Sequence, residues 1–120
     1  MKFNFNKTFE VKLTKLSNFL PYLSNKNIAV IKLDIEGGEG KVIEDAIELI
    51  SKFHVPFVYS EYNPNFLKKH GTDPKKYIEL FIKNGYKISY KGFLKGPYIS
   101  LKEINNYHYN DLYCTYDGNY

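Results

Sequence analysis

The sequence predicts an α/β fold, a partial doubly wound sheet of parallel strands that ends in an antiparallel hairpin. Two apolar, strand-like stretches, Ile28–Asp34 and Pro56–Glu61, flank an amphipathic stretch within Glu39–Phe53. Alternation of strand and helix is typical of parallel sheets with right-handed crossovers. Two further strand-like stretches, Tyr86–Lys91 and Asp111–Tyr116, close the chain. We expect them to form the antiparallel pair at one edge of the sheet.

The N-terminal part of the chain predicts one strand, one turn and then the first buried strand. Thr8–Thr14 alternates apolar and charged residues, a pattern that favours a half-exposed strand. Ser17–Leu23 predicts a helical turn, which Pro21 keeps short. Ile28–Leu33 is almost entirely apolar and β-branched, as expected of a parallel strand that is covered on both faces.

Two helices are predicted downstream. The first follows a pair of glycines, and its apolar residues recur at spacings of three and four: Val42, Ile43, Ala46, Ile47, Ile50 and Phe53. Val55–Glu61 is then a second buried strand and Asn63–Thr72 a loop. Asp73–Pro74 supplies an N-cap acceptor followed by proline at the first helical position, and Asn84–Gly85 ends the second helix.

Length and composition favour one domain over residues 1–120, with one modest core. The single cysteine, Cys114, excludes an internal disulfide framework and suits a reducing, cytoplasmic location; we expect it in the core. The start of the chain shows no secretory signal, and no apolar run is long enough for a membrane span. The net charge of +4 comes from scattered lysines without arginine, so neither nucleic acid nor membrane is predicted as a partner.

Acidic residues follow both buried strands. In open α/β sheets ligands bind beyond the carboxyl ends of the strands. Alternation along a strand places Lys32, Asp34 and Glu36 on one face, and Glu61 closes the neighbouring strand, about 4.8 Å away. Such carboxylates could act as a general base, hold a divalent metal or bind an amine or hydroxyl. A buried ion pair between Lys32 and Asp34 is an equally good interpretation.

Other motifs give no site. Glu39 at a helix start is more typical of a charge that compensates the helix dipole than of a ligand. The glycine-rich turn lacks phosphate-loop spacing, because Ile35 replaces the required first glycine and Val42 replaces the required serine or threonine. The histidines, His54, His70 and His108, lack the spacing of zinc ligands, so no metal ligand is assigned.

The run Lys32–Glu39, KLDIEGGE, is similar to the K-x-D-x-E-G-x-E signature of the FkbM methyltransferase family. Pro56–Glu61 resembles the P-x-[IV]-x-x-E strand that follows this signature. Weaker similarity extends the resemblance from about Val11 to Tyr116, through Leu13–Leu20, Asn84–Tyr86 and Asp111–Tyr116. The chain therefore resembles the C-terminal half of an FkbM-type domain.

This resemblance implies a Rossmann-like, class I methyltransferase fold. It also implies S-adenosyl-L-methionine as cofactor and O-methyl transfer to the hydroxyl of a small molecule or glycan. By resemblance, Asp34, Glu36 and Glu61 are the catalytic residues, and Lys32 and Glu39 bind the substrate. The alternative is a non-catalytic α/β binding or interaction module that keeps the scaffold alone.

The resemblance leaves out the family's first strand and its glycine loop, which hold much of the cofactor. We therefore expect weak cofactor binding, or none, by this chain alone. A half-sheet also exposes one strand edge, which is a template for association. Three outcomes are open: self-association, a partner that carries the N-terminal half, or cover by the chain's own Met1–Thr14.

Overall fold

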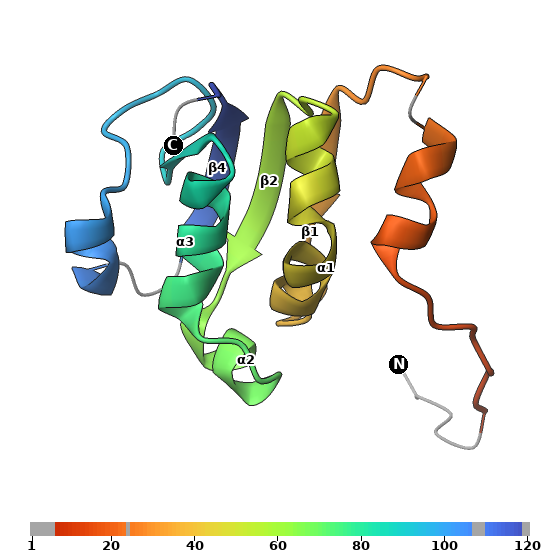
Figure 1. The fold of residues 1–120 in the computed structure, drawn as a ribbon. Helices are drawn as coiled ribbons and strands as arrows, with labels where there is room; N and C mark the ends of the chain where they lie inside the picture. The colour runs from red at the N-terminus through yellow and green to blue at the C-terminus, as the bar shows by residue number, and fades with distance from the viewer. Residues whose placement is uncertain (1–6, 24, 107–109, 119–120) are drawn as a thin grey trace.

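The computed structural model describes residues 7–23, 25–106 and 110–118. The strands form a mixed four-stranded sheet, and Figure 1 shows helices packed on it. Its strands are β1 (Val30–Leu33), β2 (Phe57–Tyr62), β3 (Tyr86–Ser89) and β4 (Asn110–Tyr116), in the spatial order β1-β2-β4-β3. The α-helices are α1 (Glu39–Lys52), α2 (Pro64–Lys69) and α3 (Pro74–Lys83), and the 3-10 turns are η1 (Leu16–Asn18), η2 (Leu20–Leu23) and η3 (Leu101–Asn106).

The central prediction is confirmed, because β1 and β2 are adjacent, parallel and joined by α1. Their register runs from Val30 opposite Phe57 to Leu33 opposite Ser60. The antiparallel pair is also confirmed, since β3 pairs with residues 113–116 of β4. β4 pairs antiparallel with β2 on its other side and so lies inside the sheet, whereas β3 takes the edge.

The core lies between the sheet and the layer formed by α1 and α3, which cover the same face (Figure 1). Val58, Ser60 and Tyr62 of β2 point into this layer and are buried. The buried thiol of Cys114 confirms its predicted place in the core, and burial raises its pKa. On the other face Val30 is 53% exposed, so the prediction that the first buried strand is covered on both faces is wrong for the described residues.

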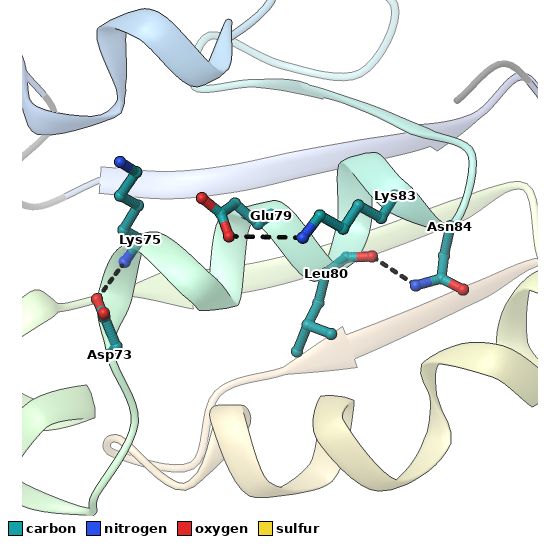
Figure 2. A network of polar contacts seen from close by, with 6 residues as sticks. All are labelled: Asp73, Lys75, Glu79, Leu80, Lys83 and Asn84. Carbon is teal, nitrogen blue, oxygen red and sulfur yellow. Dashed lines mark hydrogen bonds and ion pairs between the residues drawn. The ribbon is translucent and has the colours of Figure 1, made fainter.

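Helix α3 begins and ends where the sequence predicts, and Figure 2 shows its polar contacts. The Asp73 side chain accepts a hydrogen bond of 3.0 Å from the Lys75 backbone N–H, as an N-cap should. At the other end, the Asn84 amide donates to the Leu80 carbonyl at 2.7 Å. A partly exposed ion pair of 3.8 Å joins Lys83 and Glu79 between these caps.

The segment predicted as the loop Asn63–Thr72 contains helix α2, so that prediction is wrong. The Asn63 side chain accepts hydrogen bonds from the Asn65 and Phe66 backbone N–H groups at 3.1 and 3.2 Å. Pro64 then occupies the first helical position, where its missing N–H costs nothing. The Asn-Pro pair therefore starts a helix in the same way as Asp73–Pro74.

The predicted N-terminal strand is absent from the described residues 8–14, which are extended without strand pairing. The side chains of Phe9, Val11 and Leu13 are 85%, 86% and 96% exposed. Residues 8–14 therefore do not cover the edge of the sheet, and Met1–Asn6 lies outside the described residues. The predicted helical turn is confirmed as η1 and η2. The Ser17 backbone N–H donates a hydrogen bond of 3.2 Å to Asp45 of α1. Hydrogen bonding to Ser17 lowers the pKa of Asp45.

Tyrosine hydroxyls lie inside the core with partners. The hydroxyls of Tyr77 and Ser60 share a hydrogen bond of 2.5 Å, and the Tyr86 hydroxyl donates to the Val55 carbonyl at 2.7 Å. Burial raises the pKa of both tyrosines. Burial and the Asp73 carboxylate raise the pKa of Tyr62 to about 12.

The raised pKa values of these tyrosines predict that the protein loses stability at alkaline pH. In the unfolded chain a tyrosine has a pKa of about 10, whereas the pKa of folded Tyr62 is about 12. The contribution of Tyr62 to the free energy of unfolding is fully present below its pKa in the unfolded chain. This contribution is lost as the pH rises to its pKa in the folded protein, at about 1.4 kcal/mol per pH unit. Urea unfolding at pH 8 and pH 11 checks this, and Tyr62→Phe should lose less stability between the two. Equal losses would contradict the assignment to Tyr62.

Candidate functional site

The turn after β1 is closed by the side chain of Glu39, the first residue of α1. One carboxylate oxygen accepts from the Ile35 backbone N–H at 3.0 Å, and the other accepts from the Gly37 N–H at 2.8 Å. Glu39 is only 2% exposed. Both oxygens are therefore used inside the protein, and Glu39 holds the shape of residues 35–38. The dipole of α1 also favours a negative charge at this end.

Glu36 lies at the tip of this turn in the left-handed region, with φ 56°. This backbone conformation is rare for residues other than glycine and costs about 1–3 kcal/mol. Gly37 follows with φ 101°, and its Cα lies so close to the Phe66 carbonyl of α2 that an added Cβ would be 2.6 Å from that oxygen. The Glu39 bonds and the α2 contact together keep Glu36 in this conformation, with its side chain exposed.

Three carboxylates meet at the carboxyl ends of β1 and β2. Ligand oxygens of Asp34, Glu36 and Glu61 all lie within 4.8 Å of one another. Asp34 and Glu36 are exposed, and Glu61 is half-buried. The sequence predicts the approach of Asp34 to Glu61, and the register of β1 and β2 produces it. Such a group can take a proton, accept hydrogen bonds from hydroxyls or offer oxygen ligands to a divalent cation.

Asp111 is a fourth acidic residue at this end of the sheet, and sequence reasoning missed it. It lies opposite Glu61 in the antiparallel β2–β4 pair. Like charges placed directly opposite each other in a sheet are destabilising. The Tyr59 hydroxyl donates a hydrogen bond to Asp111, which is the main reason that the pKa of Tyr59 is raised.

Lys32 lies with these groups on the face of the sheet opposite α1 and α3. Its ammonium nitrogen is 5.9 Å from the centre of the Tyr59 ring. Tyr59 also contacts Tyr113 edge-on, at 5.5 Å between ring centres. Lys32 and Asp34 are both exposed, so the interpretation of a buried ion pair is wrong. Lys32 instead lies on an aromatic surface that leads to the carboxylates.

A surface groove lies elsewhere, between α1 and α3. It is lined by Glu44, Lys76, Glu79, Leu80 and Lys83. None of the carboxylates at the strand ends contributes to this lining. None of the helices in the described part of the chain has the length and hydropathy of a membrane span.

Part of the chain matches a known protein family. The model of the FkbM methyltransferase domain matches residues 2–88, well over half of the 120 residues. This range includes the signature Lys32–Glu39, Glu61 and all three α-helices, and it ends within β3, so β4 with Asp111 lies beyond it. No curated protein and no solved structure shows significant similarity to the chain. Since the match covers both the signature and the elements that position it, the chain belongs to the FkbM methyltransferase family.

Proposed function

We propose that this chain is the acceptor-binding part of an S-adenosyl-L-methionine-dependent methyltransferase that acts on a hydroxyl group. The observation that carries the proposal is the meeting of Asp34, Glu36 and Glu61 at the carboxyl ends of two parallel strands. Two of these residues belong to the signature within the range that the FkbM model matches. In such sheets this edge is where substrates bind.

Asp34 is the proposed general base. It is exposed at the end of β1 and can accept the proton of an acceptor hydroxyl; a positioned base is typically worth roughly 10²–10⁴-fold in rate. Glu61, level with Asp34 on β2, accepts a hydrogen bond from the acceptor. Glu36 contributes a further acceptor from its strained turn. The proximity of the three carboxylates favours an acceptor that carries several hydroxyls, as small polyols and glycans do.

Lys32 and Glu39 have different parts in this proposal. Lys32 lies over the aromatic surface beside the carboxylates and can contact the acceptor directly. Glu39 is buried, and both its oxygens already accept backbone hydrogen bonds. It therefore acts on substrate binding as a positioning residue, through the shape of residues 35–38.

The described residues do not form a complete site for the cofactor, which when bound supplies an electrophilic methyl group. A ligand of that size needs a crevice with two walls. In the part of the chain that the structure describes, β1 is an edge strand and provides one wall only. This geometry supports weak binding of S-adenosyl-L-methionine, or none, by the chain alone. It also favours the second candidate, a non-catalytic binding module that retains the scaffold. Buried Cys114 suits a cytoplasmic location for either function.

Methyl transfer from labelled S-adenosyl-L-methionine tests the proposal. The purified chain at millimolar cofactor should label a hydroxyl-bearing acceptor drawn from a set of polyols and oligosaccharides. Asp34→Asn should lower the rate roughly 10²–10⁴-fold, because the amide cannot take the acceptor's proton. Asp45→Asn is the matched control: this residue lies on α1 and bonds Ser17, so the rate should be unchanged.

Calorimetric titration separates the two candidates. The methyltransferase proposal expects a weak cofactor signal together with acceptor labelling that depends on Asp34. An absence of labelling at every cofactor concentration, in a folded protein, would favour the non-catalytic module. Tight and saturable cofactor binding would show that the inference from a single-walled site is wrong.

A further inference from the structure

Strand β1 has an uncovered hydrogen-bonding edge. Among the described residues it pairs with β2 on one side and with no strand on the other. Apolar side chains accompany this edge, since Val30 is 53% exposed and Ile35 is 49% exposed. Edge strands that remain single usually carry several charges, a proline or a bulge. β1 itself has one charged residue, Lys32, and is therefore poorly protected against the addition of a strand.

The same chain holds a segment with a strand pattern, residues 8–14, here called the donor segment, which pairs with no strand among the described residues. Phe9, Val11 and Leu13 alternate with Glu10 and Lys12 along it. The three apolar side chains are all at least 85% exposed. Alternation of this kind specifies a strand with one buried face, yet the donor segment buries neither face on its own body.

Figure 1 shows where the donor segment lies. It extends away from the sheet, beyond η1 and η2, on the side of β1. η1 is attached to α1 by the hydrogen bond between Ser17 and Asp45. The donor segment precedes this attachment and lies apart from the edge of its own β1 (Figure 1), so that edge is open to the donor segment of another copy.

We propose that the donor segment of one copy adds as a strand to the free edge of β1 in a second copy, and that the exchange is reciprocal. Two-fold exchange of this kind is a low-cost route to a dimer, because each copy offers both the strand and the edge. Main-chain hydrogen bonds supply affinity, and the alternating side chains supply register.

The opposite charges of the donor segment and of the carboxyl end of β1 support the donor segment as the strand that is added. Residues 7–15 contain three lysines, Lys7, Lys12 and Lys15, and one acidic residue, Glu10. The carboxyl end of β1 presents the opposite charge through Asp34 and Glu36, with Glu61 beside them. The added strand places lysines of the second copy beside the carboxylates of the candidate site. The dimer therefore contributes to that site as well as covering the edge.

The apolar area is sufficient for a specific contact. A buried phenylalanine removes about 150–250 Å² from water, and each donor segment adds a valine and a leucine to it. The acceptor contributes Val30, which is 53% exposed. Two reciprocal contacts of this composition bury roughly 1,000 Å² in total, near the lower limit for specific interfaces.

Light scattering at about 100 μM tests the exchange and does not depend on catalysis. The wild-type chain should have the mass of a dimer. Val11→Pro should have the mass of a monomer, since proline removes a ladder N–H in the middle of the donor segment. Circular dichroism should show both folded, because Val11 is 86% exposed and outside the core. Tyr22→Ala is the matched control: it removes a similarly exposed large side chain, 81%, from η2 and should leave the dimer intact.

A synthetic peptide of residues 7–15 identifies the acceptor. In excess it should convert the wild-type dimer to a peptide-bound monomer, whereas a scrambled peptide of the same composition should not. A monomeric wild type overturns the proposal. So does a dimer that survives Val11→Pro, which would indicate direct pairing of two β1 edges, and so does a dimer that the peptide leaves unchanged.

Discussion

Gly37→Ala is expected to destabilise the protein by about 2–5 kcal/mol. A left-handed backbone costs an alanine about 1–2 kcal/mol, and Gly37 has φ 101°. The new Cβ would also lie 2.6 Å from the Phe66 carbonyl oxygen and 2.7 Å from the His70 ring. Overpacking of this kind costs a further 1–3 kcal/mol or so. Urea unfolding monitored by circular dichroism measures the change.

Gly71→Ala provides the matched control. Gly71 also has a left-handed backbone, with φ 84°, but an added Cβ there would meet only the flexible end of Lys41 at 3.8 Å. The control should therefore lose only the backbone part, about 1–2 kcal/mol. If the two variants lose the same stability, the contact between the signature turn and α2 has no energetic importance.

Glu39→Ala should cost about 2–4 kcal/mol, the second large effect. It leaves the buried Gly37 N–H without its acceptor, which costs about 1–3 kcal/mol, and it removes the part-buried bond from Ile35, worth about 0.5–1.5 kcal/mol. Thermal unfolding measures the loss, and amide hydrogen exchange at residues 35 and 37 should accelerate. This local readout distinguishes a lost turn from a general loss of packing.

Glu44→Ala is the control on the same helix. Glu44 forms an exposed ion pair of 3.6 Å with Lys41, and such pairs contribute at most about 1 kcal/mol. A Glu39→Ala variant that unfolds like Glu44→Ala, with unchanged exchange at residue 37, would mean that the carboxylate does not close the turn.

The sequence predicts those parts of the fold that have a strong hydrophobic period and clear start or stop residues, such as caps, prolines and glycines. β1, α1 and β2 combine apolar stretches of the right length with glycines at the turn, and α3 begins at an N-cap followed by proline. Helix α2 was missed although Asn63–Pro64 carries the same signal, because six residues are too few for a periodic pattern. The N-terminal strand pattern in residues 8–14 is real, but a strand needs a neighbour, and alternation does not identify one.

The candidate site was predictable where it depends on register alone. Asp34 and Glu61 end parallel neighbours, so strand alternation brings them together. Asp111 was missed because it reaches the site through β4, whose place inside the sheet follows from a long-range pairing that local patterns do not encode. The conformation of Glu36 could not be predicted either. Glutamate has no preference for a left-handed backbone, and the surrounding contacts cause it here.

Both oxygens of Glu39 accept backbone hydrogen bonds, and this affects how mutational scans of the family's signature should be interpreted. Substitution of Glu39 should lower the amount of folded protein in the cell, and with it any activity of the proposed kind. Asp34 and Glu36 are exposed, so their variants should accumulate normally and, if the proposed function holds, lose only turnover. A selection for protein abundance and a selection for activity would therefore rank the variants of the eight signature residues in different orders. Comparing the two orders would separate Asp34 and Glu36, which are proposed to bind the acceptor, from Glu39, which shapes the turn.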